Sequence, residues 1–231
     1  MYTKQQMSES LLVAALLAIV GGFFDAYSYI ARGQVFANAQ TGNIVLLGYY
    51  VAHGQGKTAF LYIIPICSFA AGIFVTEYVK RKYNSNEKFH WRQGIIILEL
   101  LFVVIVGLLP AGNWNILANT MISFICAMQV EAFRKVEGNT FASTMCTGNL
   151  RSGSEQLFRW FFDHDKNAKQ KSVRYFFIIG CFISGAIIGT FLTIRFDGKA
   201  ISICSLILLL IFALMFAQTK KETKKEIVKI R

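Results

Sequence analysis

The sequence has few charged residues and little proline. Of its 231 residues only 16% are charged, against about 25% in a typical soluble domain, and two are proline. The charges are grouped in short clusters between long apolar runs. This distribution excludes a disordered chain and an ordinary soluble domain, which needs polar cover over its whole surface. It is typical of a polytopic membrane protein.

Patterns that carry metal or catalytic chemistry are also missing. The five cysteines are scattered, with no CxxC pair and no Cys/His pair at the spacing of a metal site. No GxSxG, HExxH, phosphate-binding or dinucleotide-binding glycine pattern occurs. We therefore expect no metal, no bound cofactor, no disulfide framework and no enzymatic activity.

Basic residues outnumber acidic ones by 24 to 13, for a formal net charge of +11. In a soluble protein this excess would suggest nucleic-acid binding. Here the basic clusters follow the ends of apolar runs, as at 80–82 and 220–225, where they set the orientation of membrane spans. We therefore predict a lipid bilayer as the environment, no nucleic-acid partner, and a basic cytoplasmic tail over 220–231.

Six apolar stretches approach the roughly 20 residues that cross a bilayer. They are 11–31, 58–79, 94–111, 114–133, 173–194 and 200–218. Two further stretches, 35–54 and 140–162, are interrupted by polar residues. The sequence therefore leaves a choice between six and eight spans.

Basic residues decide this choice. With six spans and a cytoplasmic N-terminus, the basic loops 80–92 and 134–174 both lie inside, and the external segment 32–57 holds only Arg32 and Lys57. A seventh span over 35–54 would move the first of these loops outside. We predict an all-α integral membrane protein with six transmembrane helices, cytoplasmic termini, and a single membrane domain over 1–231.

Short strings recur in the second half of the chain. Asp25-Ala26-Tyr27 reappears 106 residues later as Glu131-Ala132-Phe133, and Thr41-Gly42-Asn43 reappears at the same offset as Thr147-Gly148-Asn149. Each half thus reads as a span ending in an acid, a TGN segment, and two more spans. Because three spans is an odd number, the second copy is inverted. We predict two inverted repeats, 10–111 and 112–219, a pattern that points to a transporter with a central site.

Three acids lie within predicted spans. Asp25 is the fifteenth residue of a 21-residue apolar run, and Glu99 has no basic residue near it in sequence. A charged carboxylate at mid-membrane costs roughly 2.5–3.5 kcal/mol, so each must be neutral, paired or facing a polar cavity. Asp25 is a candidate proton site, and the alternative is a structural acid bonded to backbone. For Glu131, an ion pair with Arg134 or Lys135 competes with a site role.

The two TGN triplets each place a glycine between a hydroxyl and an amide. Thr and Asn are common N-cap residues, and glycine adopts backbone conformations that others avoid. We predict in each half a re-entrant, broken segment that turns at TGN and begins a short helix, Ile44–Tyr50 in the first copy. Such a helix N-terminus offers N–H groups to a polar or anionic solute, and a buried loop capped by its own side chains is the alternative. The candidate solute-binding residues here are Asn38, Gln40, Thr41, Gly42, Asn43, Thr147, Gly148 and Asn149.

The stretch GGFFDAYSYIARGQVFANAQTGNIVLLG (21–48), together with CAMQVEAFRKVEGNTFASTMCTGNL (126–150), resembles the YoaK-type family of bacterial membrane proteins. That family is defined by a domain of unknown function, and the likeness covers essentially the whole chain. It implies a six-span protein of the bacterial inner membrane and carries no established activity.

These features favour a secondary transporter or exchanger of a small polar or anionic solute or ion, with Asp25 as the proton site. Alternating access would come from rocking of one repeat against the other. A channel or passive facilitator shares the architecture without the coupling, and a non-transporting scaffold subunit is the third alternative. The sequence is compatible with a homo-oligomer.

Overall fold

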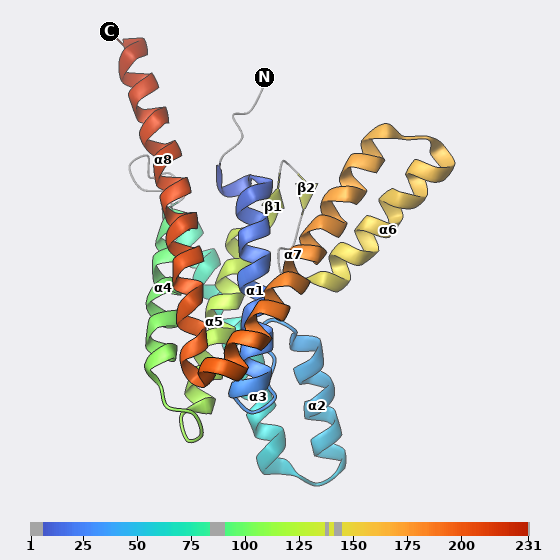
Figure 1. The fold of residues 1–231 in the computed structure, drawn as a ribbon, viewed down its shortest axis with the longest axis vertical. Coiled ribbons are helices and arrows are strands. Elements are labelled where there is room, and N and C mark those ends of the chain that lie inside the picture. The colour runs from blue at the N-terminus through green and yellow to red at the C-terminus, as the bar shows by residue number, and fades with distance from the viewer. Residues whose placement is uncertain (1–6, 84–90, 137–138, 141–144, 231) are drawn as a thin grey trace.

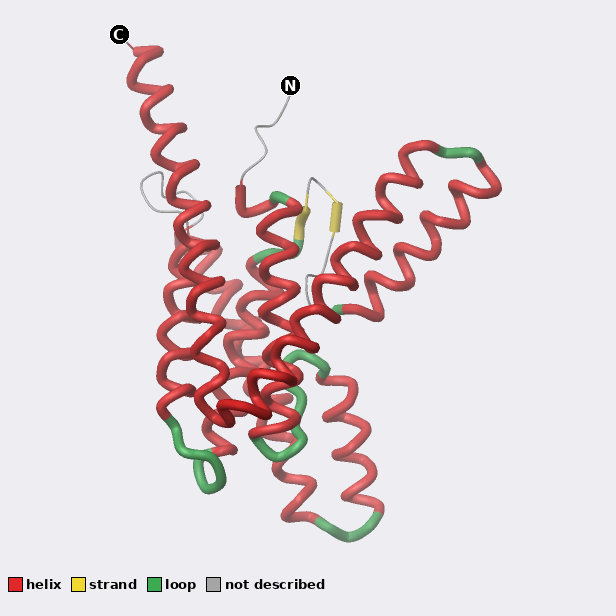
Figure 2. The backbone as a smooth tube through the Cα atoms, in the orientation of Figure 1, coloured by secondary structure: helices red, strands yellow, loops and turns green. Residues whose placement is uncertain are grey.

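A computed structural model of the chain describes residues 7–83, 91–136, 139–140 and 145–230. Parts of the predicted loop 80–92 and of the polar stretch 140–162, namely 84–90 and 141–144, lie outside the described residues. Within the described chain the fold is helical, apart from a hairpin of two-residue strands (Figures 1 and 2). The elements are η1 (Met7–Glu9), α1 (Leu11–Ala31), α2 (Gln40–Ala52), α3 (Gly56–Tyr83), α4 (Trp91–Leu108), α5 (Asn115–Ala132), β1 (Lys135–Val136), β2 (Asn139–Thr140), α6 (Cys146–Asp163), α7 (Lys166–Phe196), η2 (Asp197–Ile203) and α8 (Cys204–Ile230).

Helices α1, α3, α4, α5, α7 and α8 coincide with the six predicted apolar stretches. By length and composition, four described stretches can cross a bilayer: Leu11–Ala31, Gly56–Tyr83, Trp91–Leu108 and Lys166–Ala217. The last of these holds two helices, because η2 separates α7 from α8. Large apolar side chains on these helices face outward, and Phe74 is 79% and Phe191 71% exposed. Such apolar faces fit contact with lipid, as expected of a multi-pass membrane protein.

The principal helix contacts join the two halves of the chain. Helix α1 packs against α7, and α3 packs against α5. A Cβ on Gly22 or Gly185 would collide with backbone atoms of the facing helix, so glycine is what lets α1 and α7 touch. In the other pair the Ser68 hydroxyl donates to the Thr120 carbonyl at 2.7 Å. Each contact therefore pairs a helix that precedes residue 111 with one that follows it.

The helical hairpins project to different ends of the molecule (Figure 1). The start of α1 and the end of α8 lie together at one end. The hairpin of α2 and the first half of α3 projects at the opposite end, whereas the α6–α7 hairpin projects on the side of the termini. Between them, α1 and the C-terminal half of α7 cross at the centre.

A buried arginine ties the ends of α1, α4 and η2 together. Arg32 is 1% exposed, and its guanidinium donates to the carbonyl oxygens of Val106 and Leu109, both at 3.0 Å. Its Nε donates to the Tyr27 hydroxyl at 2.8 Å, and that hydroxyl donates to the Gly198 carbonyl at 2.8 Å. The partial negative charge at the C-terminus of α4 stabilises this buried cation. Arg32 directly follows α1, in the segment 32–57 predicted to be external, and the carbonyls of α4 bury its side chain.

Candidate functional site

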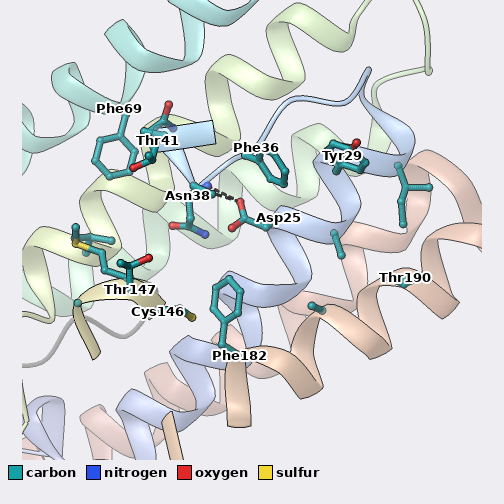
Figure 3. Close-up of a pocket in the computed structure, with 18 residues that line it drawn as sticks. Asp25, Tyr29, Phe36, Asn38, Thr41, Phe69, Cys146, Thr147, Phe182 and Thr190 are labelled. Atoms are coloured by element: carbon teal, nitrogen blue, oxygen red, sulfur yellow. Dashed lines mark hydrogen bonds between the residues drawn. The ribbon is translucent and has the colours of Figure 1, made fainter. Parts of the chain in front are cut away.

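A cavity of about 570 Å³ lies where α1, α2, α6 and α7 meet (Figure 3). This volume is within the range of small-molecule sites, roughly 300–1,000 Å³. Both halves of the chain line it. The residues predicted from the sequence that line it are Asp25, Asn38, Gln40, Thr41, Thr147 and Gly148. The structure thus brings the two TGN segments and one acid to a single cavity.

Asp25 fixes the start of α2 from the neighbouring helix α1. Its Oδ1 accepts the backbone N–H of Asn38 at 2.6 Å and that of Ala39 at 3.4 Å (Figure 3). A carboxyl at a helix N-terminus is favourable because the unpaired N–H groups there carry partial positive charge. Both of these hydrogen bonds go to Oδ1. The carboxyl also lines the cavity, where a proton or a solute can reach it.

The helices start earlier than the sequence predicts. Helix α2 begins at Gln40 and α6 at Cys146, so each TGN triplet lies in the first turn of its helix. The expected start of α2 at Ile44 is therefore wrong by about one turn. The physical reason is that Asp25 fixes from α1 the two residues that precede this helix, so the chain can turn into α2 before the triplet.

Asn43 and Gly42 shape the first TGN segment without lining the cavity. Asn43 is fully buried, and its Oδ1 accepts the N–H of Phe36 at 3.0 Å. Its Nδ2 donates to the Phe36 carbonyl at 2.8 Å and to Gln40 Oε1 at 2.9 Å. A Cβ on Gly42 would lie 2.8 Å from the Phe36 ring. These two residues therefore hold Phe36 against the start of α2.

Asn38 lies beside Asp25 in the cavity (Figure 3). Its Nδ2 donates to the Gly21 carbonyl at 3.2 Å, which fixes the orientation of the amide. Its Oδ1 is buried and has no hydrogen-bond partner among the described residues. This atom has almost no exposed surface, so it packs against protein and does not face the cavity.

The glycine of the second TGN segment has more space around it than the glycine of the first. Thr147 and Gly148 line the cavity, and a Cβ on Gly148 would meet nothing within 4 Å. Asn149 is 2% exposed and, like Asn43 in the first segment, does not line the cavity.

Two of the acids predicted as site residues do not line this cavity. Glu131 pairs with Arg134 one turn later, at 3.2 Å between Oε1 and Nη1. Glu99, in α4, is 1% exposed, and neither carboxyl oxygen has a hydrogen-bond partner among the described residues. Of the three acids in apolar spans, Asp25 is thus the one that meets the TGN segments.

Aromatic rings form much of the cavity wall, and sequence reasoning missed them. They are Tyr29, Phe36, Phe69 and Phe182. Tyr29 and Phe36 stack, with ring centroids 5.0 Å apart. Phenylalanine occurs 21 times in the chain, so composition cannot single out these rings. One signal was present, because Tyr29 follows Asp25 by four residues and therefore shares its face of α1.

Comparison with known proteins shows the family. The family described as "Protein of unknown function (DUF1275)" matches residues 13–214. The chain belongs to this family. This DUF1275 protein is also similar to the UPF0700 transmembrane protein YoaK of Bacillus subtilis (strain 168), with 27% identity over 159 residues, 66% of this chain and 69% of YoaK. No solved structure matches this chain. The resemblance to the YoaK-type family is confirmed, and the DUF1275 match spans Asp25 and both TGN segments.

Proposed function

We propose that this DUF1275 protein is a secondary transporter of a small polar solute, with the Asp25 cavity as its binding site. One observation carries the proposal: Asp25 and two TGN segments 106 residues apart in sequence line the same cavity. Intramembrane acids facing a polar cavity are typical of ion and solute pathways. Transporters built from repeats place their site at the repeat interface, beside the N-termini of short helices.

Two inverted repeats, 10–111 and 112–219, account for this arrangement. In each repeat the third element, α3 or α7, packs on the first helix of the other repeat, α5 or α1. The hairpins α2–α3 and α6–α7 project to different ends, as inverted copies would (Figure 1). Asn43 and Asn149 are buried at equivalent positions of α2 and α6. In this scheme α2 and α6 are the re-entrant helices, and rocking of one repeat against the other opens the cavity to each side in turn.

The orientation follows from the distribution of charge. The start of α1, the end of α3 and the end of α8 lie at the same end of the molecule (Figure 1). The end of α3 carries Lys80, Arg81 and Lys82. Because basic residues stay on the cytoplasmic side, this end is cytoplasmic in the bacterial inner membrane. Single cysteines test this: Gln55→Cys should react with an impermeant maleimide added outside cells, and Lys166→Cys should not. The opposite pattern contradicts the orientation.

Asp25 couples transport to protons in this scheme. The test uses proteoliposomes with a pH-sensitive dye inside, exposed in turn to small carboxylates, amines, polyols and inorganic ions. We expect at least one solute to drive proton movement in wild-type protein, and Asp25→Asn to abolish it. The amide keeps an acceptor for the Asn38 N–H, so the start of α2 is retained. The control is Glu155→Gln, which changes an exposed acid on α6 and should leave the flux unchanged.

Three other outcomes would contradict the proposal. Normal flux through a folded Asp25→Asn protein contradicts the coupling role. Solute permeation or conductance that ignores an imposed pH gradient shows a channel or passive facilitator. If no solute moves and a second protein copurifies in fixed ratio, the chain is a scaffold subunit.

A further inference from the structure

The cavity carries negative charge and hydrogen-bond acceptors. Asp25 lines it, and no lysine, arginine or histidine is among the described residues that do. The Asp25 carboxyl is an acceptor in the cavity wall. A solute that pairs with it must donate a hydrogen bond, and an ionised carboxylate binds a cationic donor most strongly.

Aromatic faces surround the Asp25 carboxyl. Phe36 and Phe182 flank Asp25 in Figure 3, and Tyr29 and Phe69 complete the wall. Ring faces attract cations, by about 0.5–1 kcal/mol at exposed sites and about 2 kcal/mol where water is excluded. The same rings bury an apolar body. A carboxylate within an aromatic wall is therefore suited to an ammonium group on an apolar skeleton.

We infer that the cavity binds a small molecule carrying a protonated amine on an apolar or aromatic body, with the amine at Asp25. This ligand class rests on the proposed transport site and narrows its solute. The ammonium donates to the Asp25 carboxyl, and the apolar body lies among the four rings.

An anion is less suited to the same cavity. The N-terminus of a helix supplies roughly half a positive charge. At α2 this partial charge already faces Asp25, whose Oδ1 takes the N–H groups of Asn38 and Ala39. The N-terminus of α6 alone leaves an anion facing the full charge of the Asp25 carboxylate. The balance therefore favours the cation.

Cys146 reports occupancy of the cavity directly, because it lines the wall at the start of α6. The test uses a protein in which Cys67 and Cys181 are replaced by alanine. Of the described cysteines that it keeps, Cys126 and Cys204 are buried, so Cys146 is the one that a reagent can reach. The rate of its reaction with N-ethylmaleimide is measured with phenethylamine, with uncharged phenethyl alcohol, and with the anion hydrocinnamate. These three probes share an aromatic body and differ in the polar group.

We expect phenethylamine at neutral pH to slow the reaction of Cys146 at a concentration about tenfold lower than phenethyl alcohol does. A difference of about tenfold in affinity is what one ion pair shielded from water would contribute. A second protein that keeps Cys67 and has alanine at positions 146 and 181 should react unchanged with every probe. Asp25→Asn should remove the preference for the amine, and Glu155→Gln should keep it. Phe182→Leu should weaken the amine about threefold or more through the lost ring face, whereas Phe177→Leu, an exposed ring on the same helix, should not.

The other outcomes separate this inference from the transport proposal. Protection by hydrocinnamate or by phenethyl alcohol at lower concentration than phenethylamine overturns the amine class and leaves a binding site for the transporter. Protection by none of the three probes also overturns the amine class. Protection by the amine, in a protein that moves no solute in the proteoliposome assay, upholds the ligand class and removes the transport function.

Discussion

The same pattern of an acid followed by TGN occurs twice in the chain and is used differently in each half. In the first half, Asp25 lines the cavity and holds the start of α2 through Asn38. In the second half, Glu131 turns to Arg134 and does not line the cavity. A repeated sequence pattern therefore does not require a repeated site. The acid of the first half lines the cavity, and the acid of the second half does not.

A single position explains much of this difference. Arg134 follows Glu131 by three residues, the spacing at which helix side chains meet. The equivalent position after Asp25 is Ser28, whose hydroxyl donates to the Asp25 carbonyl at 3.3 Å. Asp25 has no cation on its own helix at this spacing, so its carboxyl turns to the N–H groups that start α2.

The largest predicted difference between the halves is in stability. Asp25→Ala removes both hydrogen bonds at the start of α2, and we expect it to lower the free energy of unfolding by about 3 kcal/mol. Glu131→Ala removes an ion pair whose Arg134 side chain is 59% exposed, and should cost under about 1 kcal/mol. Unfolding by SDS in mixed micelles measures both. Equal losses of unfolding free energy would show that the two acids contribute equally to stability.

A smaller contrast lies within the first TGN segment. Asn43→Ala breaks three hydrogen bonds to Phe36 and Gln40, and should cost about 2 kcal/mol in the same unfolding measurement. Thr41→Ala changes a residue that lines the cavity, and should stay within about 0.5 kcal/mol while weakening solute binding. A destabilising Thr41→Ala with unchanged binding would reverse these assignments.

The smallest effect compares the two TGN glycines. A Cβ at position 42 presses on the Phe36 ring, so Gly42→Ala should destabilise by about 1 kcal/mol. Position 148 is open, so Gly148→Ala should be neutral or stabilise by up to about 0.5 kcal/mol through helix propensity. Thermal unfolding in detergent ranks the two. Equal destabilisation would mean that the second segment is packed like the first.

Six apolar runs in the sequence predict the helices α1, α3, α4, α5, α7 and α8, because each run is nearly uninterrupted and close to the length that crosses a bilayer. Asp25 and the TGN triplets stand out for the same reason: polar groups inside apolar runs need an explanation. The start of α2 could not be predicted, because the residues that precede it are held by Asp25 on another helix. The buried position of Arg32 depends in the same way on the carbonyl groups of α4, and the cavity's aromatic wall comes from four separate elements.

The central claim is that both TGN segments line one cavity that opens to each side of the membrane in turn. Accessibility of Thr147→Cys tests it most directly, in a protein whose Cys67, Cys146 and Cys181 are alanine. A membrane-impermeant thiol reagent is applied to right-side-out and inside-out vesicles, with Thr41→Cys as the matched position in the first segment. Alternating access predicts that each cysteine reacts from both sides, and that a bound solute slows both reactions. Reaction of both cysteines from one side alone, with or without solute, would contradict the account.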